Sequence, residues 1–228
     1  MTNSDLIVVS GHLGSGKTEF SLNFTTHLKA AEPQRHVALC DLDFINPYFR
    51  SRRHKQYLES FGVEVVTPVH EEVSIADMPS ISGKIKALIN DHSARVVLEV
   101  GGDSNGAIVI AHLKQFIQTR GYSHYMVLNL NRPDTCDYEN AVEMMRSIEK
   151  TSGLPVTDII LNNHLMNETT AETVVSGYKK SAAMNFSKSP IKYICVSSDF
   201  LEEARGIKIK ENEEWFVLNR VLRYAHEV

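Results

Sequence analysis

The strongest constraint on the fold is a regular alternation of short apolar runs with longer amphipathic stretches. The apolar runs are rich in Val, Ile, Leu and aromatic residues, which favours strands, and the amphipathic stretches favour helices. The expected strands are 6–10, 36–43, 63–68, 95–100, 124–130, 157–163 and 191–197. The expected helices are 17–30, 81–91, 107–119, 137–150, 169–180 and 211–226. Such strands, apolar on both faces, predict an α/β fold: a doubly wound, mainly parallel seven-stranded sheet with helices on both faces.

Composition narrows the class of protein. The 43% of hydrophobic and 23% of charged residues are typical of a globular chain, and no segment is rich enough in Pro, Gly or Ser to link two domains. We therefore expect a single domain, 1–228. A net charge of -4 gives no general attraction for nucleic acid, and no apolar run reaches the length of a membrane span. The expectation is a cytoplasmic protein that binds neither nucleic acid nor membrane.

A glycine-rich segment, SGHLGSGKTE, joins the first expected strand to the first expected helix. It fits the pattern G-x-x-x-x-G-K-[ST] at Gly11, Gly16, Lys17 and Thr18. The glycines let backbone N–H groups converge on phosphate oxygens beside the positive end of the helix. In this pattern Lys17 reaches the β- and γ-phosphates as a catalytic residue, and the Thr18 hydroxyl ligates Mg2+. The residues expected to surround the nucleotide here are Gly11, His12, Leu13, Gly14, Ser15, Gly16, Lys17, Thr18 and Glu19.

Two aspartates end the second expected strand, in CDLDFINPYFRSRR. Asp41 and Asp43 lie two residues apart, so they point to the same side of the strand and reach the carboxyl edge of the sheet together. Asp41 is expected to act near Mg2+ through its bound waters, and Asp43 to polarise an attacking water. The alternative is that one of them caps a helix or a turn.

The fourth expected strand also ends in an acid, in RVVLEVGGDSNGA. Glu99 at this position can hold the water shell of Mg2+, and the N–H of Gly102 can reach a γ-phosphate. A structural acid satisfied by a neighbouring loop is the alternative for Glu99. The basic cluster Arg50, Arg52, Arg53, His54 and Lys55 fits a solvated surface run, although one arginine there can bind a phosphate or an acidic partner.

Together these motifs resemble P-loop NTPases of the CobQ/CobB/MinD/ParA type, in the SIMIBI class that also contains signal-recognition GTPases. The resemblance rests on GHLGSGKT, on CDLDFINPYFRSR as a first switch, on VVLEVGGDSNGA as a second switch, and runs in order through LNNHLMNETTAETV. Within that type, NPYFRSR, GGDSNGA and LNNHL with the following ETTAE look like a CobQ/MinD-like subfamily of bacterial ATP-binding proteins.

The resemblance implies ATP and Mg2+ as cofactors. It also implies base contacts from Asn162 or Asn163 and from the loop around Ser198, between Ser197 and Asp199. An asparagine carboxamide can pair with the edge of adenine, although an asparagine that simply ends the strand is the alternative. The chain lacks an N/T-K-x-D signature for guanine, giving NLNRPDT and LNNHLMN instead, so adenine is favoured.

The departure from the resemblance is His12. Proteins of the MinD/ParA type that dimerise face to face carry a second lysine here, which reaches the nucleotide of the partner subunit. A histidine is mostly neutral at cytoplasmic pH and cannot supply that charge. A sandwich dimer is therefore not expected, although a homodimer of another geometry stays open. His12 either donates a hydrogen bond to phosphate or covers the loop.

The chain end NEEWFVLNRVLRYAHEV carries Trp215, Phe216, Leu218 and further apolar residues near helical spacing. We expect this helix to pack on the core of the protein rather than on a membrane. The function expected overall is that of a slow, Mg2+-dependent ATPase whose switch loops regulate a protein partner. A ligase or kinase acting on a small acidic metabolite and a non-catalytic nucleotide sensor are the alternatives.

Overall fold

The computed structural model describes residues 4–42, 54–66, 78–101 and 104–221. Five residues singled out from the sequence lie outside this part of the chain: Arg50, Arg52, Arg53, Asp43 and Gly102. The strands are β1 (Leu6–Ser10), β2 (Val37–Leu42), β3 (Glu64–Val66), β4 (Arg95–Val100), β5 (Ser123–Leu128), β6 (Asp158–Leu161), β7 (Ile191–Ser197) and β8 (Glu214–Leu218). The α-helices are α1 (Lys17–Ala31), α2 (Lys55–Ser60), α3 (Met78–Asn90), α4 (Ser104–Arg120), α5 (Tyr138–Ser152), α6 (Ala171–Ala182) and α7 (Leu201–Ala204).

The eight strands form one parallel sheet in the order β3-β2-β4-β1-β5-β6-β7-β8. The predicted α/β architecture and all seven predicted strands are confirmed. Because β1 is central, the loop that follows it opens at the middle of the carboxyl edge, between the ends of β4 and β5. This edge is where α/β sheets usually bind ligands.

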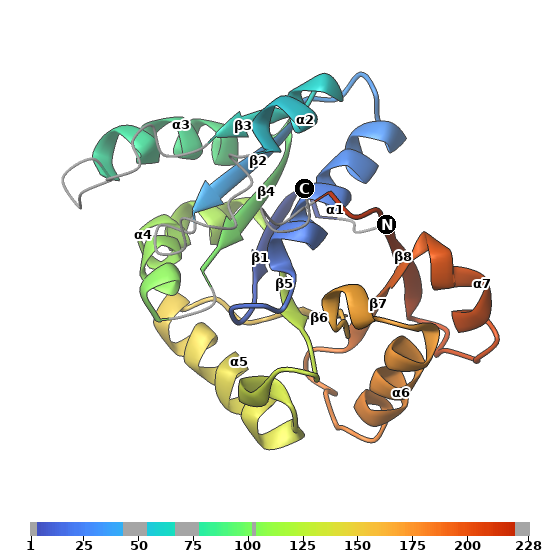
Figure 1. Ribbon diagram of the computed structural model, residues 1–228. Coiled ribbons are helices and arrows are strands. Elements are labelled where there is room, and N and C mark those ends of the chain that lie inside the picture. Colours follow the sequence, from blue (N-terminus) through green and yellow to red (C-terminus); the bar gives the residue numbers. More distant parts are fainter. Residues whose placement is uncertain (1–3, 43–53, 67–77, 102–103, 222–228) are drawn as a thin grey trace.

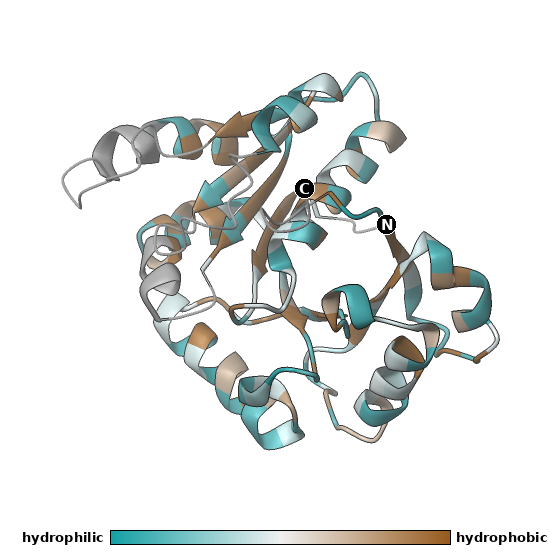
Figure 2. Ribbon diagram, in the orientation of Figure 1, coloured by the Kyte–Doolittle hydropathy of each residue, from teal (hydrophilic) through white to brown (hydrophobic). Residues whose placement is uncertain are grey.

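Helices cover both faces of the sheet (Figure 1). One face packs on α1 and α2 through Phe20, Phe24, Leu28 and Leu58. The other face packs on α3 and α4 in one cluster and on α5 and α6 in a second cluster. Strand side chains alternate between these layers: Ile7 and Val9 face α1, and Leu6 and Val8 face the opposite layer. Figure 2 shows the central strands as hydrophobic and much of the outer helix surface as hydrophilic.

The helix predicted at 211–226 is wrong, because Glu214–Leu218 is the edge strand β8. It pairs in parallel with β7, from Tyr193 opposite Glu214 to Ser197 opposite Leu218. Phe216 packs with the aromatic side chains of α1, whereas the adjacent Trp215 packs in the cluster on the other face. A period of two thus places the apolar residues on both faces of the sheet, where a helix would place them on one. Within the described residues the sheet consequently has eight strands rather than seven.

No helix in the four described ranges is both long and apolar enough to cross a bilayer.

Candidate functional site

The glycine-rich loop wraps the N-terminal end of α1. The Ser15 N–H donates to the carbonyl of His12 (3.0 Å), which closes the loop into a tight turn. Lys17 and Thr18 are the first two residues of α1 and are only 6% and 5% exposed. Their side chains therefore lie at the positive end of a fifteen-residue helix, where an anion is favoured.

Two glycines of the loop are required by close contacts. A Cβ on Gly11 would stand 2.5 Å from the carbonyl oxygen of Val127 in β5. A Cβ on Gly16 would stand 2.2 Å from Nδ2 of Asn162, and the φ of Gly16 is +86°, in the left-handed region. The two glycines thus let the loop pass directly against the ends of β5 and β6.

The segments after β5 and β6 hold the loop in place. Nδ2 of Asn162 donates to the carbonyl of Ser15 at 2.8 Å, and Nε of Arg132 donates to the carbonyl of Gly14 at 3.0 Å. The His12 side chain also points toward the segment after β5. Its Nε2 lies 3.4 Å from Oδ2 of Asp134, and its Nδ1 lies 3.0 Å from the carbonyl oxygen of Leu13. The loop is therefore held by contacts within the protein, and His12 contributes two of them. Leu13, at the tip, is 58% exposed.

Two carboxylates lie side by side at the carboxyl edge, next to Thr18. Asp41 of β2 and Glu99 of β4 are register partners on neighbouring strands, and each is 1% exposed. The Thr18 hydroxyl donates a hydrogen bond to Oε1 of Glu99. A hydroxyl and carboxylate oxygens are the ligands that Mg2+ prefers. In the described residues no group of three or more His, Cys, Asp or Glu side chains forms a metal site. A set of one hydroxyl and one or two carboxylates fits Mg2+ held mainly by waters and phosphates.

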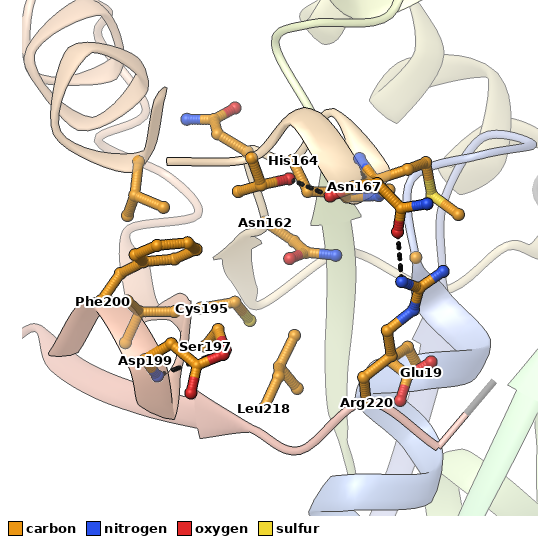
Figure 3. A pocket seen from close by; sticks show the side chains of 16 residues that line it. Glu19, Asn162, His164, Asn167, Cys195, Ser197, Asp199, Phe200, Leu218 and Arg220 are labelled. Carbon is orange, nitrogen blue, oxygen red and sulfur yellow. Dashed lines mark hydrogen bonds between the residues drawn. The ribbon is translucent and has the colours of Figure 1, made fainter. Parts of the chain in front are cut away.

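A cavity of about 360 Å³ opens beside the loop (Figure 3). Its wall begins at Gly16 of the glycine-rich loop and Glu19 of α1 and continues along the ends of β6, β7 and β8. The lining residues are Gly16, Glu19, Asn162, Asn163, His164, Met166, Asn167, Thr169, Val174, Cys195, Val196, Ser197, Asp199, Phe200, Leu218 and Arg220. Its size lies in the range of small-molecule sites, which is about 300–1,000 Å³.

The two candidate asparagines have different roles. Asn163 accepts a hydrogen bond from the N–H of Leu130 at 2.8 Å, and its amide packs against Gly177, where an added Cβ would stand 1.7 Å from Nδ2. These contacts tie the ends of β5 and β6 to α6. Because the amide nitrogen of Asn162 donates to Ser15, its amide oxygen is the atom with which it can accept a hydrogen bond from a ligand.

Ser197 at the end of β7 and Asp199 in the turn that follows line the cavity, whereas Ser198 between them is exposed and outside the lining. The sequence did not indicate His164, Asn167, Phe200, Leu218 or Arg220, which also line the cavity. Burial lowers the pKa of His164 to about 4, and the positive charges of Arg132 and Arg220 act in the same direction. His164 is therefore neutral at physiological pH.

Several solved structures share the fold of this chain. The signal recognition particle receptor FtsY from Elizabethkingia anophelis, in complex with GDP, superposes with a TM-score of 0.58 at 18% identity, over 86% of this chain and 58% of that chain. FtsY from Thermotoga maritima gives 0.57 at 18% identity, over 82% of this chain and 60% of that one. FlhF complexed with GTP and Mg2+ gives 0.53 at 18% identity, over 83% and 64%.

The chain has the fold of a P-loop NTPase. It spans less than two thirds of each of these three P-loop proteins, and at 18% identity the likeness extends to the fold alone. No protein-family model and no curated protein sequence matches the chain. The P-loop fold is thus common to this chain and the signal-recognition proteins, whereas the closer CobQ/MinD/ParA type rests on the sequence motifs.

Proposed function

We propose that the protein binds ATP with Mg2+ at the glycine-rich loop and hydrolyses it slowly. One observation carries the proposal. Lys17 and Thr18 are buried at the N-terminal end of α1, beside Glu99 and Asp41, and the same helix end borders the cavity at the ends of β6, β7 and β8. A triphosphate on the loop therefore has a cation, a helix dipole and metal-binding oxygens at one end, and room for a base at the other.

The choice of adenine is supported by the end of β6. When N/T-K-x-D is placed on residues 162–165, Leu165 takes the position of the carboxylate that pairs with guanine. Leu165 is apolar and 41% exposed. Asn162 instead offers an acceptor, which suits the exocyclic amine of adenine. Since similar structures hold GDP or GTP, ATP and GTP have to be compared directly.

The residues fit a magnesium ion. Thr18 would ligate it through the hydroxyl that now contacts Glu99, and Asp41 and Glu99 would hold its bound waters. When bound, Mg2+ would neutralise charge on the phosphates. Lys17 would neutralise charge on the γ-phosphate, and we assign the orientation of the attacking water to Asp43, which lies outside the described residues.

We propose that ATP binding and hydrolysis change how the protein binds a protein partner. Loops that a γ-phosphate orders and its loss releases are a general switching device. Asp41 and Glu99 each lie one residue before the end of a strand, and the chain continues from these two strands into segments 43–53 and 102–103. We propose that the γ-phosphate acts on both segments. The partner can be a different protein or a second copy in a geometry other than the lysine-bridged sandwich.

Calorimetric titration of ATP and GTP, with and without Mg2+, tests the proposal. We expect ATP to bind more tightly than GTP, Mg2+ to be required, and Lys17→Ala to abolish the heat. Lys29→Ala is the matched control, because Lys29 lies in the last turn of the same helix and contacts Arg35 instead. Retention of full ATP affinity by Lys17→Ala would contradict the proposal.

Turnover measurements then separate the possible outputs. Slow hydrolysis that a protein accelerates supports a partner-regulated ATPase. Stimulation by a small acidic metabolite identifies a ligase or kinase instead. Absence of product in a single turnover at saturating Mg2+ identifies a sensor without catalysis.

A further inference from the structure

The mouth of the cavity is bridged by a contact between two segments that are distant in the sequence. Nη1 of Arg220, two residues after β8, donates a hydrogen bond to Oδ1 of Asn167, in the short turn η4 (Met166–Glu168) that follows β6. Both side chains line the cavity, and Figure 3 shows them facing each other along one side of it. The hydrogen bond therefore connects two segments that border the cavity, the turn that carries Asn167 and the segment after β8 that carries Arg220. These two segments are called its two lips below.

The lip that carries Arg220 is fixed to α1. Asn23 of α1 accepts from the N–H of Asn219 at 2.9 Å and donates to its carbonyl at 3.0 Å. On the other side of Arg220, the N–H of Val221 donates to Oε1 of Glu19, one turn before Asn23 on the same helix. Because both neighbours of Arg220 are held, its side chain leaves the chain at a defined point beside the phosphate loop.

The opposite lip is equally constrained. Met166 has a φ of 57°, a left-handed conformation that side chains with a Cβ rarely adopt. The hydroxyl of Thr169 holds this turn, since it accepts from the N–H of Leu165 at 2.8 Å and donates to the carbonyl of Met166 at 2.7 Å. Unfavourable backbone geometry that the surroundings maintain is typical of ligand clamps. Here it presents Asn167 to Arg220.

Between the lips the cavity is walled by apolar side chains, including Val174, Phe200 and Leu218. A flat base can enter this space, and an arginine at its mouth is suited to cover the base. The guanidinium group is planar and weakly hydrated, and it stacks on aromatic rings through cation–π contact. A lysine side chain carries the same charge but has no planar group that could stack on the base.

We infer that Arg220 contacts the base of the bound nucleotide and closes the cavity over it, with Asn167 setting its position. The inference rests on the proposed nucleotide site and adds a base-binding residue outside every motif of the P-loop. Arg220 thereby couples occupancy of the cavity to the segment that leaves β8, because the same segment is anchored to α1.

The test compares ATP with inorganic tripolyphosphate, which occupies the phosphate loop but has no base. Both ligands are titrated with Mg2+ into the wild-type chain and into Arg220→Ala, Arg220→Lys and Asn167→Ala. Arg205→Ala is the control, because Arg205 is an exposed arginine that pairs with Glu202 and does not line the cavity. Thermal unfolding verifies that each variant is folded.

We expect Arg220→Ala to raise the Kd for ATP by about three- to thirtyfold, the range of a cation–π contact, and to leave the Kd for tripolyphosphate unchanged. Arg220→Lys should recover part of the loss, Asn167→Ala should show a smaller loss of the same selectivity, and Arg205→Ala should match the wild type. An unchanged Kd for ATP in Arg220→Ala, or equal losses for both ligands, overturns the role of Arg220.

Titrations of the wild-type chain distinguish a wrong inference about Arg220 from a wrong proposed function. If it binds ATP no more tightly than tripolyphosphate, the cavity is not a base site, and the inference about Arg220 is wrong while the phosphate loop remains. If it binds neither ligand, the proposed nucleotide function itself is wrong.

Discussion

Replacement of Gly16 by alanine provides a quantitative test of how the phosphate loop is built. The φ of Gly16 is +86°, and a residue with a Cβ is less stable in this left-handed region by about 1–2 kcal/mol. The new Cβ would also stand 2.2 Å from Nδ2 of Asn162, so that amide has to move away. Its buried hydrogen bond to Ser15 is then lost, which costs about 1–3 kcal/mol. The two effects sum to roughly 2–5 kcal/mol in the free energy of unfolding.

Gly121→Ala is the matched control. Gly121 has a φ of +80°, nearly that of Gly16, but an added Cβ would have no heavy atom within 4 Å. It should lower the free energy of unfolding by the backbone contribution alone, about 1–2 kcal/mol. The smaller unfolded-state effect of replacing glycine by alanine is common to both variants and cancels in their difference.

Urea unfolding of Gly16→Ala, Gly121→Ala, Asn162→Ala and the double variant Gly16→Ala/Asn162→Ala measures these contributions. In the Asn162→Ala background the 2.2 Å contact with Nδ2 is removed, and Nε2 of His164 at 3.3 Å is the near neighbour that remains. Gly16→Ala should therefore cost about as much as Gly121→Ala, about 1–2 kcal/mol. If the two glycine variants are equally stable in the wild-type background, Asn162 does not hold the loop and the reasoning is refuted.

Three further predictions concern the edge strand, a buried histidine and the metal site. Phe216→Ala should lower the free energy of unfolding by about 3–5 kcal/mol, because Phe216 is buried against Phe20, whereas Glu214→Ala on the same strand should change it by less than about 0.5 kcal/mol in urea unfolding. Burial lowers the pKa of His124 to about 4, below its unfolded value of 6.5. Between these two pH values the unfolded chain binds more protons than the folded chain, so the free energy of unfolding decreases as the pH is lowered. Between pH 7.5 and 5 this loss is about 2 kcal/mol, and His124→Gln should lack it; an identical pH dependence in the variant would exclude His124 as its source. Glu99→Gln should raise the Mg2+ concentration needed for half-maximal ATP binding by about ten- to a hundredfold, as measured by titration of Mg2+ at fixed ATP, and an unchanged requirement would remove Glu99 from the metal site.

Sequence patterns that depend only on nearby residues predicted most of the architecture. The apolar runs and the helical periodicity located seven strands and five of the six expected helices, because burial on both faces of a parallel sheet imposes those patterns locally. The loop at Gly11–Thr18 was predicted in its correct context, after a strand and before a helix. Asp41 and Glu99 were each expected near Mg2+ from the sequence, whereas their position as register partners on neighbouring strands needed the folded sheet.

The failure at 211–226 has a physical cause. Trp215, Phe216 and Leu218 are compatible with a helix when they are read with the apolar residues that follow them. Phe216 instead completes the aromatic cluster of α1 and β7, with its ring 5.2 Å from that of Phe20 and 5.4 Å from that of Tyr193. The free edge of β7 supplies the backbone partners that favour a strand there.

The sequence by itself determined seven of the eight described strands, the glycine-rich loop after β1 and the acids at the edge of the sheet, because each leaves a periodicity or a spacing within a few residues. The tertiary structure alone decided that Asn162 holds the glycine-rich loop while Asn163 contacts Leu130, that His12 turns toward Asp134, and that Arg220 contacts Asn167 beside the cavity. These choices depend on contacts between segments far apart in the chain. Such contacts leave no periodic pattern, since a single hydrogen bond or a single close approach is enough to define each one.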